Sequence, residues 1–105
     1  MEHKHTPGPW QVSAGAVDNP RLIVENDLGL PVCAMSLRGV QGDINKMEAN
    51  ARLIAAAPEL LVALEQLVSD YERGIHVEFG GSPWLKEKLE ELDYARAAIA
   101  KATGA

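Results

Sequence analysis

Two histidines near the amino terminus have the spacing closest to that of a chemical site. His3 and His5 are separated by one residue, so in an extended segment both rings point the same way and could bind a transition-metal ion. No cysteine or carboxylate cluster accompanies them, and we expect a solvated pair with no metal. His76 stands alone in a strand-like segment, where a surface or hydrogen-bonded position is expected.

No side chain stands in a pattern typical of nucleophilic catalysis. The serines lie in predicted turn, strand, helix and cap positions, and none lies in a glycine-elbow sequence. Cys33 is the single cysteine, which excludes an intramolecular disulfide. Within a predicted strand it is expected to be a buried apolar residue. The sequence therefore predicts a protein that is not an enzyme and holds no cofactor.

Arg38 and the loop after it form a weak candidate for an anion site. Residues 39–43 lead into a predicted helix, whose free N–H groups attract anions. The loop lacks the lysine and the serine or threonine of a phosphate-binding loop, and Asp43 opposes an anion. Asp43 is better suited to cap the following helix.

Length, composition and charge bound the possible functions. The 105 residues support one domain, and 47% apolar with 24% charged residues is typical of a soluble globular protein. The charge of −5 repels phosphate, so non-specific nucleic-acid binding is not expected. The longest apolar run, residues 53–58, is too short for a membrane span, and residues 1–5 lack the apolar core of a signal peptide.

Residues 43–73 carry the helical pattern around which the chain is organised. At 100° per residue Met47, Ala51 and Ile54 share one side of a first helix. Proline disfavours helical backbone in the residue before it, so we expect a second helix after a break at Pro58, with a kink as the alternative. Gly74 is expected to end this bent helix pair. Its second apolar stripe comprises Leu60, Leu61, Leu64, Leu67, Val68 and Tyr71.

Strand patterns precede the helices. Residues 1–9 are expected to form an arm, and residues 10–40 a β-meander with a turn at 26–29. Residues 75–79 alternate and are expected to be a fourth strand or a loop. Residues 82–103 are expected to form a last helix, beginning at Ser82-Pro83. The predicted fold is α+β, a three- to four-stranded antiparallel β-meander packed against three helices.

The remaining candidate residues are polar or aromatic side chains that could bind a ligand or a partner. Asn50 lies about 80° from the centre of the apolar stripe, so we expect it half-buried, as a tie to the arm or a ligand contact. Arg52 points the opposite way, to solvent or a subunit contact. Trp10 is expected to anchor the arm, and Trp84 to pack in the core or, alternatively, to anchor an interface. The outer face of the last helix is solvated or a partner surface, and carries Glu87, Glu90, Glu91 and Asp93.

Two motifs resemble those of small proteins encoded by tailed bacteriophages and prophages. Residues 5–10 read His-Thr-Pro-Gly-Pro-Trp, and residues 48–61 read Glu-Ala-Asn-Ala-Arg-Leu-Ile-Ala-Ala-Ala-Pro-Glu-Leu-Leu. The likeness covers residues 5–68. It implies a phage accessory protein acting in the cytoplasm of the bacterial host, and it brings no catalytic residues to transfer.

Two functional hypotheses follow. The first is a non-catalytic anti-defence binder that masks a host protein or sequesters a small nucleotide-like signalling ligand. The second is a small hydrolase that uses His5, His76 or a metal held by the arm. We also expect homo-oligomerisation, because the alanine-rich residues 49–57 and the last helix offer more apolar surface than one small sheet covers.

Overall fold

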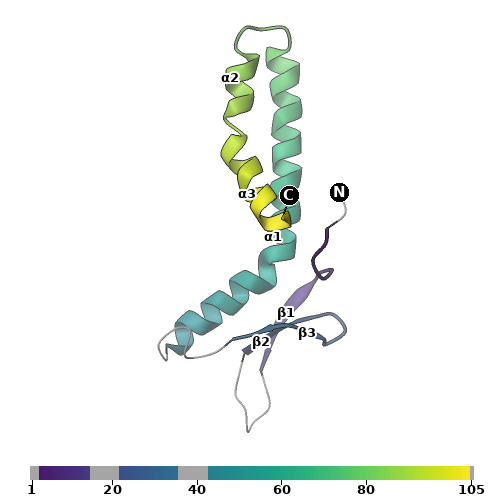
Figure 1. Cartoon of the computed structure of the whole chain (residues 1–105), viewed down its shortest axis with the longest axis vertical. Helices are drawn as coiled ribbons and strands as arrows, with labels where there is room; N and C mark the ends of the chain where they lie inside the picture. Colours follow the sequence, from purple (N-terminus) through teal and green to yellow (C-terminus); the bar gives the residue numbers. More distant parts are fainter. Residues whose placement is uncertain (1–2, 15–21, 36–42, 105) are drawn as a thin grey trace. The chain divides into compact units, whose positions relative to one another are not determined.

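The computed structural model describes residues 3–14, 22–35 and 43–104. In this part of the chain the elements follow the order β1-β2-β3-α1-α2-α3 (Figure 1). Contacts group the residues into two compact units, Met1–Glu59 and Leu60–Ala105, which we call unit 1 and unit 2. The α+β class is as predicted, while the single domain stays a prediction.

Unit 1 contains a three-stranded antiparallel sheet. Its strands are β1 (Trp10–Ala14), β2 (Leu22–Asn26) and β3 (Pro31–Ala34), in that spatial order. Val24 in the middle strand pairs with Val12 on one side and with Cys33 on the other. Cys33 is half-buried, not buried as expected, because β3 is an edge strand of this sheet.

Asn26 fixes the turn between β2 and β3. Its side-chain oxygen accepts hydrogen bonds from the backbone N–H groups of Leu28 and Leu30, at 3.0 and 2.9 Å. Its own N–H donates to the carbonyl of Leu30 at 3.0 Å. An Asn side chain that replaces backbone partners in this way favours a turn over a continued strand. The predicted turn at 26–29 is confirmed.

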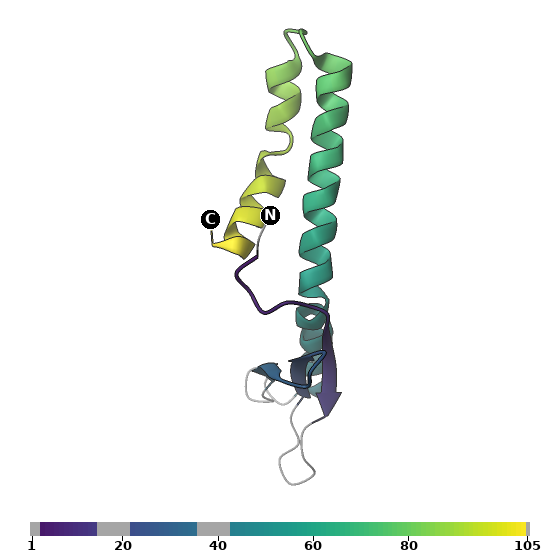
Figure 2. The ribbon, with the colours of Figure 1, turned by 90° about the vertical axis from the view of Figure 1, so that its right-hand side faces the viewer.

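The first part of α1 (Ile44–Phe79) lies beside the sheet in both views of unit 1 (Figures 1 and 2). The Oδ1 atom of Asp43 accepts hydrogen bonds from the N–H groups of Asn45 and Lys46, at 3.0 and 3.2 Å. This confirms the predicted cap. Met47 and Ala51 are buried, as is Val24 of β2, so the predicted apolar side of the helix is correct.

The predicted break at Pro58 is wrong, because α1 is one helix of 36 residues that continues through Pro58. Proline has no N–H, so the carbonyl of Ile54 lacks its helical partner, a loss that normally disfavours proline inside a helix. Pro58 is, however, buried. A Cβ on Gly8 of the arm would lie 3.0 Å from the Cβ of Pro58. Burial of the ring against the arm offsets part of the helical cost.

The prediction of a strand or loop at residues 75–79 is also wrong. These residues form the end of α1, and Gly74 lies inside the helix. Ile75 is buried at 4% exposure, whereas Val77 is 83% exposed. The helix ends at Gly80, whose N–H donates to the carbonyl of His76 at 3.0 Å. A Cβ on Gly80 would collide with that same oxygen, so glycine is needed here.

The predicted last helix is divided into α2 (Leu85–Glu90) and α3 (Asp93–Thr103). Between them the N–H groups of Glu91 and Leu92 donate to carbonyls three residues back, at 3.3 and 3.1 Å. Such bonds tighten the helical turn. Leu92 is buried there in one cluster with Val68 and Ile75. Partly buried apolar residues of α2 and α3 pack on that cluster: Leu85, Leu89, Ala95 and Ile99.

The core of unit 2 therefore joins α1 to the two helices that follow it. Both views show α2 and α3 beside the later part of α1 (Figures 1 and 2). At the start of α2 the Oγ atom of Ser82 accepts the N–H of Trp84 at 3.1 Å. Along α3 Arg96 forms a 2.7 Å ion pair with Glu72 of α1.

Replacing Ile75 tests the helical assignment of residues 75–79. Ile75→Ala leaves a cavity in the unit 2 core and is expected to lower the free energy of unfolding by about 2–4 kcal/mol. Val77→Ala, on the exposed side, is the matched control and is expected to change it by less than about 0.5 kcal/mol. Urea denaturation of the full chain measures both. Equal losses would contradict the helix, because an alternating strand places both side chains on one face.

Replacing Gly8 tests the contact between the arm and α1. Gly8→Ala places a methyl group against Pro58 and is expected to cost about 1 kcal/mol by overpacking. Gly74→Ala is the control, because a Cβ there meets nothing within 4 Å. It is expected to stabilise the helix by about 0.5–1 kcal/mol. Thermal denaturation should show opposite shifts, and an unchanged midpoint for Gly8→Ala would argue against the contact.

Candidate functional site

The backbone carbonyl group of Thr6 binds two predicted site residues, His5 and Trp10. The Nδ1 atom of His5 donates to the carbonyl oxygen of Thr6 at 2.8 Å, and the Trp10 indole N–H donates to the same oxygen at 3.2 Å. The His5 ring stacks on His3 at 5.0 Å and meets the Trp10 ring edge-on at 5.9 Å. Trp10 thus anchors the arm, as predicted.

A shallow cleft of about 390 Å³ brings Trp10 together with Arg52. Arg52 is exposed and forms a 3.7 Å ion pair with Glu48. This pairing fits the solvated position expected for Arg52. The cleft runs between β1 and α1 within unit 1, and its remaining lining residues are Val12, Ala55, Ala56 and Glu59.

Two other predicted positions are wrong in their burial. Asn50 is exposed, not half-buried, because the buried side of α1 is occupied by Met47 and Ala51. Trp84 is 61% exposed and does not join the core, because it precedes α2 in the turn that follows α1; its alternative role as an interface anchor stays a prediction. Arg38 and the loop around it lie outside the described residues.

The acidic side chains of the carboxy-terminal segment lie on the surface as expected. Glu87, Glu90 and Glu91 are exposed, and the carboxylate of Glu91 pairs with the ammonium group of Lys88 at 3.4 Å. Part of this negative charge is therefore compensated within α2 and the residue that follows it. The alternative given for this face, a partner surface, stays a prediction.

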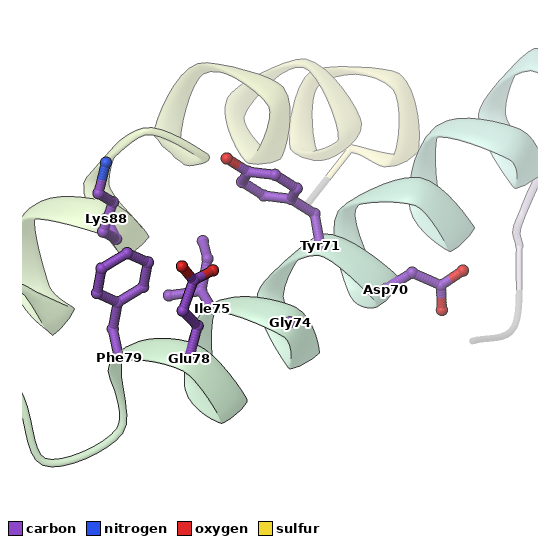
Figure 3. A pocket seen from close by; sticks show the side chains of 7 residues that line it. All are labelled: Asp70, Tyr71, Gly74, Ile75, Glu78, Phe79 and Lys88. Carbon is purple, nitrogen blue, oxygen red and sulfur yellow. The ribbon is translucent and has the colours of Figure 1, made fainter.

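A second cleft, of about 410 Å³, lies within unit 2 and was not predicted. Figure 3 shows Tyr71 and Phe79 projecting from α1, with Ile75 and Glu78 between them. Lys88 of α2 lies 5.5 Å from the centre of the Phe79 ring. Aromatic, aliphatic and charged groups therefore meet in one open cleft, which we call the hairpin cleft after the helical hairpin formed by α1 and α2.

Two of the three charged side chains that line the hairpin cleft have partners within the described ranges. Lys88 is held by Glu91 and by the Phe79 ring. Asp70 pairs with Arg73 at 3.5 Å and accepts a hydrogen bond from Gln66, and its carboxylate points away from the other lining side chains (Figure 3). Glu78 forms no hydrogen bond or ion pair with any residue in the described part of the chain.

Large apolar side chains continue from this cleft along α1. Leu60, Leu67 and Tyr71 are 53%, 66% and 52% exposed. They follow at steps of seven and four residues, which places them on one side of a helix. We call this set the α1 stripe. It is the part of the predicted second stripe that the core of unit 2 leaves uncovered.

His76 belongs to a surface network, not to the arm. Its Nε2 atom lies 4.0 Å from the carboxylate of Glu72, which also pairs with Arg96. The position on the surface agrees with the sequence-based expectation. Among the residues that the structure describes, no three His, Cys, Asp or Glu side chains are grouped to hold a metal ion.

The prediction that Gly74 ends the helix separates the residues of the hairpin cleft, whereas α1 continues through Gly74 to Phe79. One signal could have revealed this continuation. Tyr71, Ile75 and Phe79 follow at four-residue steps, which continue the helical period through Gly74. The same steps explain why residues from this segment meet at one cleft.

Comparison with known proteins identifies a family. None of the helices in the described ranges is long and apolar enough to span a membrane. Neither the curated proteins nor the solved structures contain a match to the chain. The family model described as Salmonella phage P22 protein Y8K6 matches residues 1–105. The chain therefore belongs to this family of phage proteins, in agreement with the resemblance seen in its sequence.

Proposed function

We propose that this protein is a non-catalytic phage accessory protein that binds and masks a host protein, in the manner of an anti-defence inhibitor. One observation carries the proposal. The α1 stripe exposes large apolar side chains that lead directly into the hairpin cleft, because Tyr71 belongs to both. Membership of a phage protein family supports a host target.

The energetics of the α1 stripe favour a macromolecular partner. Leu60, Leu67 and Tyr71 each keep more than half of their surface in water. Burying a leucine or an aromatic side chain completely contributes about 1.5–3 kcal/mol. Tyrosine is also enriched among the residues that dominate binding energy. A helix lying along this stripe would bury all three side chains and could place one of its own in the cleft.

The form of the hairpin cleft favours masking a protein over sequestering a small ligand. Sites for small ligands enclose most of the ligand surface. This cleft is open, and Leu67 extends the apolar surface beyond it along α1. An extended partner can use the stripe and the cleft together, whereas a nucleotide-like ligand would reach only the cleft.

Self-association is a separate proposal that concerns unit 1. There α1 exposes Leu53 beside three alanines, Ala49, Ala56 and Ala57. Small side chains permit close approach of a second helix. Native mass spectrometry of the purified chain measures the oligomeric state, and a monomer at micromolar concentration would end this proposal.

Substitution within the α1 stripe tests the masking function. Tagged full-length protein is produced in the bacterial host, and captured proteins are quantified by mass spectrometry. Leu67→Asp is expected to reduce capture of the target by about tenfold or more, because a charge in the apolar contact must be desolvated. Leu28→Asp, at a 78% exposed position in the unit 1 turn, is the matched control and should capture as well as the unsubstituted chain.

The proposal would be abandoned if capture of every host protein were unaffected by Leu67→Asp. It would also be abandoned if the purified chain carried a stoichiometric nucleotide in native mass spectrometry and captured no protein. Circular dichroism of both variants establishes that they are folded, so that a loss of capture reports on the surface.

A further inference from the structure

We propose that the hairpin cleft binds the guanidinium group of an arginine presented by a basic amphipathic helix of the host protein. This inference rests on the proposed function and specifies the chemistry of the partner. It is argued from three features of the cleft: an uncompensated carboxylate, the two aromatic rings beside it and the apolar stripe that leads into it.

Glu78 supplies the uncompensated carboxylate. It follows Tyr71 by seven residues, two turns of α1, so both side chains lie on one side of the helix. Figure 3 shows the Glu78 carboxylate between the rings of Tyr71 and Phe79. None of the described residues forms an ion pair with it. The carboxylate is therefore available to an incoming cation.

The other charges of the cleft do not neutralise Glu78. The ammonium group of Lys88 is engaged by Glu91 at 3.4 Å and by the Phe79 ring at 5.5 Å. Asp70 is engaged by Arg73 at 3.5 Å. Once these pairs are set aside, the charge left in the cleft is that of Glu78, in a chain whose net charge is −5. Complementarity therefore selects a cationic group.

The aromatic rings favour arginine among cationic side chains. A guanidinium group is planar, stacks on aromatic faces and offers paired N–H donors that match a carboxylate. Tyr71 provides an open face, since Lys88 lies over the Phe79 ring, and Glu78 provides the carboxylate. Arginine binds such a combination of groups better than a compact, strongly hydrated ammonium does.

The α1 stripe specifies what carries the arginine. Leu60 and Leu67 lie on the same side of α1 as Tyr71 and are exposed. A partner helix with apolar residues at helical spacing can cover them, with its arginine one or two turns further along. A second copy of this chain is disfavoured as the occupant of the hairpin cleft, because the self-association proposed above uses Leu53 and the alanines of unit 1 and leaves this cleft open.

The experiment uses a minimal probe that needs no knowledge of the host protein. The full-length ¹⁵N-labelled chain is titrated with N-acetylarginine methylamide and, separately, with N-acetylcitrulline methylamide, which is of similar shape but uncharged. Arginine is expected to shift the amide resonances of Tyr71, Gly74, Glu78 and Phe79. Citrulline is expected to leave them in place.

Two charge-matched variants complete the test. Glu78→Gln is expected to weaken binding of the arginine probe about fivefold, the upper range for a solvent-exposed ion pair. Asp27→Asn removes the same charge from the exposed unit 1 turn and should leave the affinity unchanged. Equal shifts with citrulline, equal affinity in Glu78→Gln or equal weakening in both variants would each overturn the inference. Concentration-dependent dimerisation abolished by Glu78→Gln would also overturn it, in favour of a second copy.

The probe titration and the capture experiment can fail independently of each other, so their outcomes distinguish this inference from the masking function. If capture of a host protein depends on Leu67 and the arginine probe does not bind, this inference is wrong and the masking function stands. If the probe binds at the hairpin cleft and capture does not depend on Leu67, the masking function is wrong.

Discussion

The contact of Leu92 with Val68 and Ile75 is the interaction on which unit 2 depends. It holds the chain after Gly80 against the later part of α1, since the tightened turn before α3 places Leu92 in the core. This core buries one side of the later part of α1. Tyr71 and Glu78 lie at its edge, where neither burial nor an ion pair within the described residues constrains them. The open cleft is thus a consequence of the packing.

Local signals were enough to predict the strands, the turn and the helix cap of unit 1. The strand β2 is rich in β-branched and aliphatic residues, and it ends at Asn26 because the Asn26 side chain takes over backbone hydrogen bonds. Asp43 was identified as a cap because Asp accepts from the first free N–H groups of a helix. The turn and the cap each form between residues close in sequence, so a short stretch of sequence is sufficient to predict them.

Predictions failed where a contact distant in sequence decides between local alternatives. Residues 75–79 alternate like a strand. Leu92 nevertheless covers Ile75, and the burial of both side chains stabilises the helix. Pro58 disfavours a helix locally, yet α1 continues through it beside Gly8 of the arm. Trp84 is large and apolar, but its place in the turn leaves it exposed. The helical period of Tyr71, Ile75 and Phe79 indicates which side chains share one side of α1, but the cleft that they line depends on the first of these contacts.

The close approach of Gly8 to Pro58 links the motif at residues 5–10 to the motif at residues 48–61. A side chain at position 8 would press against the ring at position 58. Selection should therefore act on the two positions jointly. A larger residue in the arm is accommodated best by a smaller residue in the helix, so substitutions at positions 8 and 58 are expected to occur together.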